Sequence, residues 1–281
     1  MPPTKTRFPD NPFTAPDATP PWRGGLVEYL PVVVAKATPR ASGDPKGRPL
    51  TSFGLGKAVI FFSGRSIDFA LKEGQSELTI PQKEYLFEQL GFPISKIVNI
   101  RQVHGDHIIA ATAEDLKSNG QVPEADGIIT NLSGLPIAVR TADCLPVFIF
   151  DPKKNCIGLV HAGWRGTEKQ ISLKAAKLMR DYWACAPEDL QIAFGPAIRS
   201  CCYEVGPEFR NFFPQEIVER DHKMFLDLAL ANRKQLLRYG VKSKNILDSA
   251  VCTGCDKLYF SYRREGKGTG RHISVMVLSA V

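Results

Sequence analysis

The sequence is poor in histidine and has no long apolar run. Only five of its 281 residues are histidine. No uninterrupted apolar stretch approaches the about twenty residues that span a bilayer, so no membrane protein is expected. The proline-rich segment 1–25 lacks the apolar core of a secretory signal. We therefore expect an extended or disordered arm there and a cytoplasmic location.

Cysteine occurs seven times, an odd number in a chain without a visible export signal. That count argues against a disulfide framework, so most thiols should be reduced. Cys252-Thr253-Gly254-Cys255 is a CxxC motif without a second pair at zinc-finger spacing, which favours local packing over metal binding. Cys201 and Cys202 follow the Gly195-Pro196 break, where we expect a tight turn, although both could line a site. The roles of these four thiols stay open.

The net charge is +7, but the basic residues are dispersed and mixed with acidic ones. The densest basic stretches, 36–57 and 263–271, do not carry the interleaved aromatics of a base-stacking platform. A nucleic-acid partner is therefore not expected. The charge fits attraction of anionic small molecules equally well.

Strand-like and helical segments follow one another without regular alternation, which indicates an α+β fold. One helix is predicted to begin at Thr167, where Thr167-x-x-Gln170 can form a capping box. A second is predicted over 223–239, ending at Gly240. The remaining predicted elements are strands at 26–34, 58–62, 191–194, 258–262 and 272–278, a strand-rich region at 97–160, a helix at 81–90 and a long loop at 38–57.

Three potential metal ligands each lie where a predicted strand meets a loop. They are His104 in Gln102-Val103-His104-Gly105, Cys144 in Ala142-Asp143-Cys144, and His161 at the start of His161-Ala162-Gly163-Trp164-Arg165-Gly166. Functional side chains gather at such junctions. Two histidines and one cysteine, with a fourth position left open, suit a catalytic zinc. His107 is expected to face solvent instead.

The residues alone leave other interpretations open. Asp126 is a candidate acceptor behind the ligands or a proton shuttle, and equally a simple Asp-Gly turn residue. Cys144 could be the nucleophile of a metal-free cysteine hydrolase, with His161 or His104 as its base. A zinc-stabilised binding module would need a fourth ligand at finger spacing, and none is visible.

An ordered series of motifs extends this picture from about residue 58 to the C-terminus. Besides the three ligand segments, it contains Ala125-Asp126-Gly127, Gly195-Pro196-Ala197-Ile198, Cys202-Tyr203-Glu204-Val205 and Phe260-Ser261-Tyr262-Arg263-Arg264. Together they resemble the laccase-domain family, whose members are often labelled polyphenol oxidases and are regarded as purine nucleoside phosphorylases with adenosine deaminase activity. The arm at 1–25 and the strand and basic loop at 26–57 lie outside the resemblance, which covers 58–281.

The resemblance implies a single domain with a layered α-β-β-α sandwich and mixed sheets. It implies a zinc ion held by His104, Cys144 and His161. The implied substrates are purine nucleosides (adenosine, inosine, guanosine and methylthioadenosine) and inorganic phosphate, with deamination of adenosine besides. A copper cluster is not expected, because five histidines cannot supply a blue-copper centre and a trinuclear cluster together.

One segment departs from the family pattern. Phe62-Ser63-Gly64-Arg65-Ser66-Ile67-Asp68 is short, lacks a glycine pair and has Asp68 where the family has asparagine. Arg65 matches the family arginine proposed to meet phosphate and is our first candidate for that role, with Arg165 second. Gln102 is placed with them at the substrate. A negative Asp68 beside an anion site would weaken phosphate binding.

Overall fold

The computed structural model describes residues 53–55, 57–71, 75, 77–90, 97–112 and 122–279. The predicted arm at 1–25 and strand at 26–34 lie outside this part. The predicted loop at 38–57 is wrong at its end, because Phe53–Leu55 form strand β1 against β2 (Ala58–Phe62), a backbone pairing that no local pattern reveals. Among the described residues, no helix is both long and apolar enough to cross a membrane.

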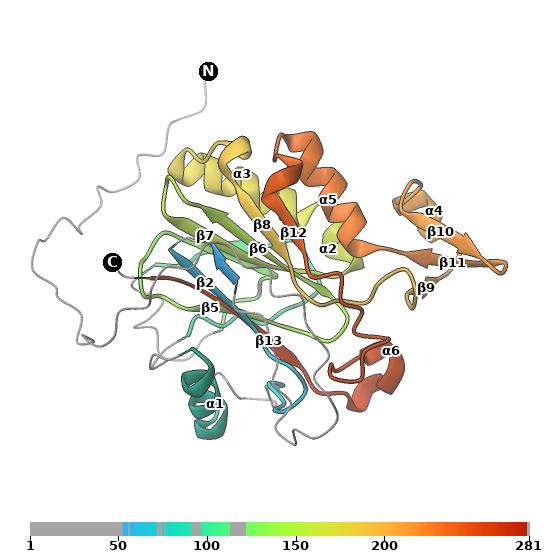
Figure 1. The fold of residues 1–281 in the computed structure, drawn as a ribbon, viewed down its shortest axis with the longest axis horizontal. Helices are drawn as coiled ribbons and strands as arrows, with labels where there is room; N and C mark the ends of the chain where they lie inside the picture. The colour runs from blue at the N-terminus through green and yellow to red at the C-terminus, as the bar shows by residue number, and fades with distance from the viewer. Residues whose placement is uncertain are drawn as a thin grey trace, which may run out of the picture. The chain divides into compact units, whose positions relative to one another are not determined.

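In the described part of the chain, the larger sheet has six strands in the order β12-β8-β6-β7-β4-β3. Figure 1 labels β12, β8, β6 and β7 of this sheet. Its central strands pair antiparallel, whereas β12 and β3 pair parallel with their neighbours at the two edges. The sheet is therefore mixed. Its strands are β3 (Ile108–Ala110), β4 (Gly127–Thr130), β6 (Leu145–Asp151), β7 (Cys156–Ala162), β8 (Gln191–Phe194) and β12 (Ile246–Asp248).

The smaller main sheet has four antiparallel strands in the order β1-β2-β13-β5. Strand β5 spans Ile137–Thr141 and β13 spans His272–Leu278. After β5 the chain leaves this sheet and enters β6 of the other one through residues 142–144. Cys144 therefore lies on a crossover between the two sheets.

Strand β6 shows how the layers are packed. Successive side chains of a strand point to opposite faces, and in β6 Phe148 and Phe150 enter the core between the two sheets. Val147 and Ile149 enter a second core beneath helices α3 (Ile171–Trp183) and α5 (Leu228–Tyr239). The apolar side chains of β6 therefore pack alternately into two cores, because both faces of the strand are covered.

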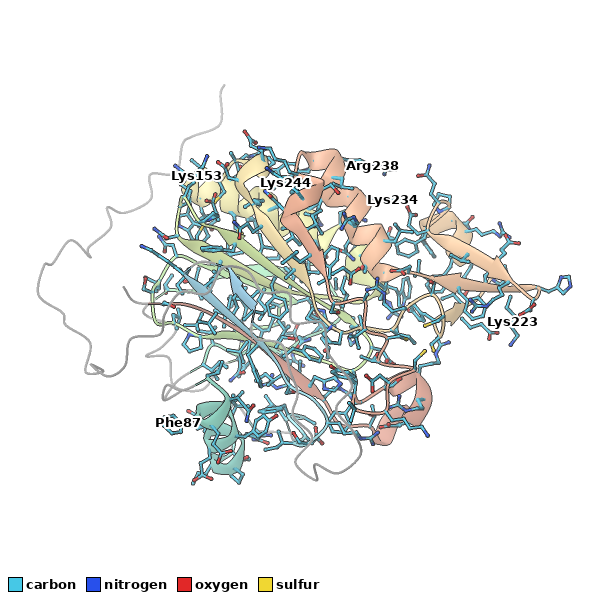
Figure 2. All side chains as sticks on the ribbon, in the orientation of Figure 1. Phe87, Lys153, Lys223, Lys234, Arg238 and Lys244 are labelled. Atoms are coloured by element: carbon cyan, nitrogen blue, oxygen red, sulfur yellow. The ribbon has the colours of Figure 1, made fainter. Side chains whose placement is uncertain are left out.

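Helix α1 (Ile80–Leu90) forms the fourth layer. Its Leu86 packs in a third core with Phe61 of β2 and Val275 of β13. Phe87 is half-exposed and points away from the sheet (Figure 2). The layers are therefore α3 and α5, the six-stranded sheet, the four-stranded sheet and α1. This confirms the predicted α-β-β-α sandwich in a single α+β domain.

The remaining elements are short. Strand β9 (Glu204–Val205) joins β10 (Ile217–Arg220) and β11 (Lys223–Leu226) in a small antiparallel sheet. The short helices are α2 (Trp164–Glu168), α4 (Phe209–Phe212) and α6 (Tyr262–Glu265), with 3-10 turns at Pro187–Asp189, Ser243–Asn245 and Gly266–Gly268.

The helix predicted from Thr167 is wrong in its start and in its cap. Helix α2 begins already at Trp164, and a break at Gln170 separates it from α3. Gln170 has a left-handed backbone with φ 61° and makes no capping bond with its side chain. The Thr167 hydroxyl is buried and accepts a hydrogen bond from Asn232 Nδ2 at 3.0 Å, so tertiary packing uses the group that the capping box required.

Two further predictions need correction. The helix expected from residue 223 begins after Asp227, whose carboxylate accepts the Leu230 N–H at 3.0 Å, because residues 223–226 pair as β11. Its end at Gly240, with φ 111°, is confirmed. The strand expected at 258–262 is a turn leading into α6, which Ser261 caps by accepting the Arg264 N–H at 3.2 Å.

Candidate metal centre

Strand register brings three sequence-distant segments to one end of the six-stranded sheet. The first residue of β6 pairs with the last residue of β7, so Cys144, which precedes β6, lies beside His161. Strand β4 begins opposite Val160, and the His161 N–H donates to the Asp126 carbonyl at 2.7 Å. The antiparallel pairing alone therefore places a thiol, a carboxyl and an imidazole together.

The ligand atoms of His104, Cys144 and His161 all lie within 4.8 Å of one another. The two imidazole rings meet edge to face, with centroids 4.8 Å apart. His161 is 3% exposed, Cys144 is half-buried and His104 is exposed, so solvent reaches the group from the His104 side. A Cβ at Gly163 would lie 3.2 Å from the Cys144 sulfur, so glycine there leaves the ligands room.

Asp126 is fully buried behind the two histidines. Its Oδ1 lies 2.7 Å from His161 Nδ1. Its carboxylate also accepts the backbone N–H groups of Val103, His104 and Gly105 at 3.3, 3.0 and 2.6 Å. One carboxylate thus orients the His161 ring by binding its Nδ1, so that Nε2 is the nitrogen left for a metal. It also fixes the loop that carries His104.

Charge is shared between Cys144 and His161. Burial raises the pKa of Cys144. The charge of His161 and hydrogen bonds from both histidines lower it by more than burial raises it, to about 6. Burial lowers the pKa of His161, whereas the charge of Cys144 and the bonds to Asp126 and Cys144 raise it to about 9. Without metal, a thiolate–imidazolium pair is therefore favoured at neutral pH, and the thiolate is the form that binds metal.

The donor set fits a metal ion. Two imidazoles and a thiolate are ligands that zinc and similar borderline metals take. A carboxylate hydrogen-bonded to the far nitrogen of a ligating histidine is the common arrangement around such ions. Here the two imidazoles and the thiolate are those of His104, His161 and Cys144. The carboxylate behind the ligating histidine is that of Asp126. Three protein ligands leave at least one coordination position for water or substrate.

Asp143 is a site residue that sequence reasoning did not single out. It has a left-handed backbone with φ 85°, a strained conformation for a residue with a side chain. Its buried carboxylate accepts Thr253 Oγ1 at 2.6 Å and Ser261 Oγ at 3.1 Å. It also accepts the Arg263 N–H at 2.7 Å. Asp143 thus holds the strained crossover that presents Cys144, and its place inside the Ala-Asp-Cys motif was the available signal.

Gln102 and His107 are both engaged with backbone. The Gln102 amide pairs with β5, donating to the Arg140 carbonyl and accepting the Arg140 N–H, each at 2.7 Å. Both ends of the amide are occupied, so Gln102 anchors the His104 loop to the neighbouring sheet. His107 is exposed, and its Nδ1 lies 2.8 Å from the Glu124 carbonyl.

Arg65 and Asp68 lie on a loop that contacts the 258–271 segment. Arg65 forms an ion pair with Glu265 at 2.7 Å and stacks on the Phe260 ring at 5.2 Å. The Asp68 carboxylate accepts the N–H groups of Ala70 and Arg271, both at 2.8 Å. Each predicted phosphate-site residue therefore has a structural partner, and these partners are not the three ligands.

Arg165 lies in helix α2, which follows the strand that carries His161. Its guanidinium is exposed and stacks on the Trp164 ring at 4.4 Å. Burial raises the pKa of Tyr203, whose hydroxyl also senses the charges of Cys144, Arg263 and Arg165. Arg263 lies over the Tyr203 ring at 5.2 Å. Arg263 and Arg165 thus both lower the pKa of a phenol that the charge of Cys144 raises.

His272 should make stability depend on pH. Burial lowers its pKa to about 4, and its Nε2 accepts the Phe260 N–H at 2.8 Å. As pH falls from 6.5 towards 4, this histidine binds a proton in the unfolded chain but stays neutral in the folded chain. The free energy of unfolding should therefore fall across this window, by about 3 kcal/mol in total from this group.

Urea unfolding at pH 7.5, 5.5 and 4.5 would measure this effect. His272→Gln should lower stability at pH 7.5 but show a shallower loss towards pH 4.5 than the unmodified protein. Equal losses in the two proteins would contradict the assignment.

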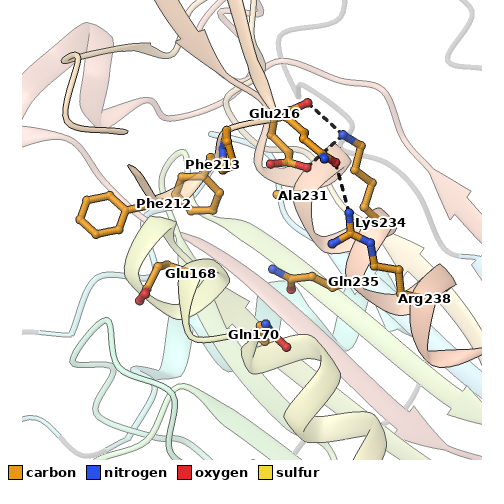
Figure 3. A pocket seen from close by; sticks show the side chains of 11 residues that line it. Glu168, Gln170, Phe212, Phe213, Glu216, Ala231, Lys234, Gln235 and Arg238 are labelled. Atoms are coloured by element: carbon orange, nitrogen blue, oxygen red, sulfur yellow. Dashed lines mark hydrogen bonds and ion pairs between the residues drawn. The ribbon is translucent and has the colours of Figure 1, made fainter. Parts of the chain in front are cut away.

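A separate pocket of about 210 Å³ lies between α2, α5 and the 212–216 segment (Figure 3). Lys234 crosses its wall, pairing with Glu216 at 3.0 Å and donating to the Gln215 carbonyl at 2.9 Å. None of the predicted site residues lines this pocket.

Comparison with known proteins gives the family. The family described as "Multi-copper polyphenol oxidoreductase laccase" matches residues 62–279. A relative named purine nucleoside phosphorylase YlmD, from Geobacillus stearothermophilus, is 34% identical over 86% of this chain and 88% of its own. A relative named adenosine deaminase RL5, from an unknown prokaryotic organism, is 33% identical over 73% of this chain and 81% of its own. The crystal structure of YlmD from G. stearothermophilus superposes with a TM-score of 0.71 at 31% identity, covering 80% of this chain and 93% of that one. The chain belongs to the laccase-domain family.

Proposed function

We propose that this protein is a zinc-dependent purine nucleoside phosphorylase that also deaminates adenosine. The observation that carries the proposal is the convergence of the ligand atoms of His104, Cys144 and His161 to within 4.8 Å of one another, backed by the buried Asp126. The relatives' names, purine nucleoside phosphorylase and adenosine deaminase, support purine nucleosides and inorganic phosphate as the substrate class. Within that class we propose adenosine, inosine, guanosine and methylthioadenosine.

His104, Cys144 and His161 would hold the zinc ion. Bound there, zinc would act as a Lewis acid and lower the pKa of a water towards about 7. The protein's own part is to keep Cys144 ionised and to orient the His161 ring so that Nε2 is the nitrogen left for the metal. Asp126 does the latter by accepting the Nδ1 proton at 2.7 Å.

Arg165 is the better placed of the two phosphate candidates. Its exposed guanidinium contacts a ring, whereas Arg65 is already paired with Glu265. In phosphorolysis, phosphate attacks the anomeric carbon of the ribose while the purine leaves with the bonding electrons. Arg165 would hold the attacking phosphate, and Arg65 could join only by breaking its ion pair.

Copper does not follow from the family description. A multicopper oxidase needs a blue-copper centre and a trinuclear cluster, which together require many imidazoles. Of the five histidines in the chain, two belong to the ligand group, and His107 and His272 bond to backbone. The proposal therefore assigns zinc.

One observation favours a second candidate, a metal-free cysteine hydrolase. The pKa of Cys144 is lowered to about 6 despite its burial, chiefly by His161, as in an activated nucleophile. The arrangement Cys144–His161–Asp126 also has the order of a nucleophile, a base and an orienting carboxylate.

Metal removal separates the two candidates. Dialysis against a strong chelator should abolish both phosphorolysis and deamination, and stoichiometric Zn²⁺ should restore both. A cysteine hydrolase would keep its activity in chelator and lose it on alkylation of Cys144. Full nucleoside turnover in protein shown to be metal-free would exclude the zinc proposal.

A further inference from the structure

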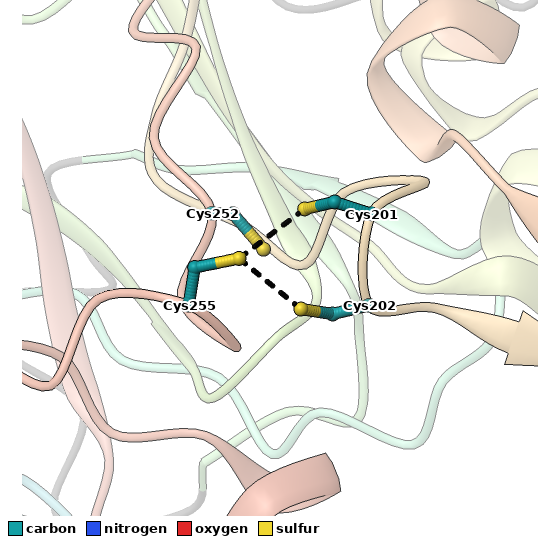
Figure 4. A group of neighbouring side chains, drawn as sticks. All are labelled: Cys201, Cys202, Cys252 and Cys255. Atoms are coloured by element: carbon teal, nitrogen blue, oxygen red, sulfur yellow. Dashed lines mark hydrogen bonds between the residues drawn. The ribbon is translucent and has the colours of Figure 1, made fainter.

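Four cysteines that the proposed reaction does not use form a second cluster. The sulfur atoms of Cys201, Cys202, Cys252 and Cys255 all lie within 4.8 Å of one another. Cys255 Sγ lies 3.4 Å from that of Cys201 and 3.2 Å from that of Cys202. The four side chains point inward from two loops (Figure 4).

Backbone pairing holds the two loops together. Cys252 forms a parallel bridge with Ala197, and the Thr253 N–H donates to the Ala197 carbonyl at 3.1 Å. Cys202 and Tyr203 both donate N–H groups to the Arg199 carbonyl at 2.9 Å. The resulting turn lets two adjacent cysteines face one centre, which the sequence-based interpretation did not foresee.

The two loops that carry the four cysteines approach each other closely at Gly254. A Cβ at this position would lie 2.8 Å from Cys202 Cβ and 3.0 Å from Cys202 Sγ. A side chain at position 254 would therefore push the two loops apart. The glycine in the CxxC motif is what permits four sulfurs at one point.

The surroundings suit a negatively charged centre. Arg264 donates to the Thr253 and Gly254 carbonyls at 2.7 and 3.1 Å. Arg220 donates to the Cys201 carbonyl at 3.3 Å. A tetrathiolate zinc centre carries two net negative charges, and these guanidinium groups would offset them.

The sulfur separations are those that one metal ion could bridge. Zinc bound to four thiolates at about 2.3 Å places neighbouring sulfurs about 3.8 Å apart. The sulfur separations here, 3.2 and 3.4 Å for two pairs and at most 4.8 Å for all, bracket that value. Four soft ligands in a closed set select zinc for a structural role, without a position for substrate.

We propose that Cys201, Cys202, Cys252 and Cys255 bind one structural Zn²⁺ ion, distinct from the ion proposed at His104, Cys144 and His161. The four thiols would give up their protons on binding. The site clamps the 197–203 loop to the 251–256 loop. From the latter, the Thr253 hydroxyl donates to Asp143 at 2.6 Å, so the clamp supports the crossover that carries Cys144.

Metal analysis of four purified proteins tests this proposal. The unmodified chain should carry two zinc ions, and Cys144→Ala should carry one. The double variant Cys252→Ser/Cys255→Ser should also carry one, and the combination of all three substitutions should carry none. Co²⁺ loaded into the Cys144→Ala protein should give the intense thiolate charge-transfer absorption of a four-sulfur site, and this measurement does not depend on whether the serine variants fold.

The outcomes separate this site from the catalytic one. One zinc in the unmodified chain that survives Cys144→Ala supports the cysteine site even if the proposed catalytic zinc fails. A metal-free Cys144→Ala protein with no cobalt–thiolate absorption overturns the proposal. So does a Cys202–Cys255 disulfide found in protein purified without reductant. Iron in place of zinc would overturn the choice of metal.

Discussion

Cys144→Ala protein is expected to lose its catalytic metal and both activities together. The substitution removes the only sulfur ligand of the group and leaves His104 and His161, with their ring centroids 4.8 Å apart. Two neutral imidazoles hold zinc far more weakly than a set that includes a thiolate, because the thiolate neutralises part of the ion's charge. Turnover of adenosine should fall to the background rate, with and without phosphate.

His107→Ala is the matched control. His107 is three residues from His104 on the same loop but is exposed and bonds to the Glu124 carbonyl. Its removal should change stability by less than about 0.5 kcal/mol and leave activity intact. Cys144→Ala protein that retains catalytic turnover would show that the thiol is neither ligand nor nucleophile.

Asp126→Asn should weaken metal binding and destabilise the fold at once. The new amide keeps the shape of the carboxylate but puts an N–H₂ group where a carboxylate oxygen now accepts N–H donors from His104 or Gly105. Burial raises the pKa of Asp126, but the hydrogen bond and charge of His161 lower it below its ordinary value, so the native group is a carboxylate. Metal affinity should fall about 10- to 100-fold.

Asp126→Asn should lower the free energy of unfolding by about 1–3 kcal/mol, because the new side-chain N–H₂ group would face a buried backbone N–H group. Asp106→Asn, on the same loop, is the control. Asp106 forms ion pairs with Lys169 and Lys174 near the surface, and such pairs contribute about 0–1 kcal/mol. Zinc titration and urea unfolding of the two variants measure both effects. Equal zinc affinity in Asp126→Asn and the unmodified protein would contradict the orienting role.

The convergence of the three ligands could not be derived from spacing. Each segment looked like a junction of strand and loop, but it is the register of β6 on β7 and of β4 on β7 that brings Cys144 and Asp126 to His161. The family resemblance supplied this long-range information. The α-β-β-α layers were predicted from the same source, with the α+β class also visible in the irregular order of strands and helices.

Predictions of helix boundaries from local sequence were wrong where tertiary contacts engage the same residues. Thr167 has the pattern of a helix cap, but its hydroxyl accepts from Asn232, a residue of α5. Residues 223–226 continue the helical pattern but pair with β10 instead. The four-cysteine cluster was missed because its halves are about fifty residues apart and adjacent cysteines seemed unsuited to one ion.

Product analysis tests the central claim most directly. Zinc-loaded protein would be incubated with adenosine, with and without inorganic phosphate, and adenosine, inosine, adenine and hypoxanthine would be separated by chromatography. We expect inosine under both conditions, and adenine and hypoxanthine only with phosphate, because phosphorolysis converts adenosine to adenine and inosine to hypoxanthine. Inosine alone would mean that neither Arg165 nor Arg65 supports phosphorolysis. No product from metal-replete protein would contradict the proposed function.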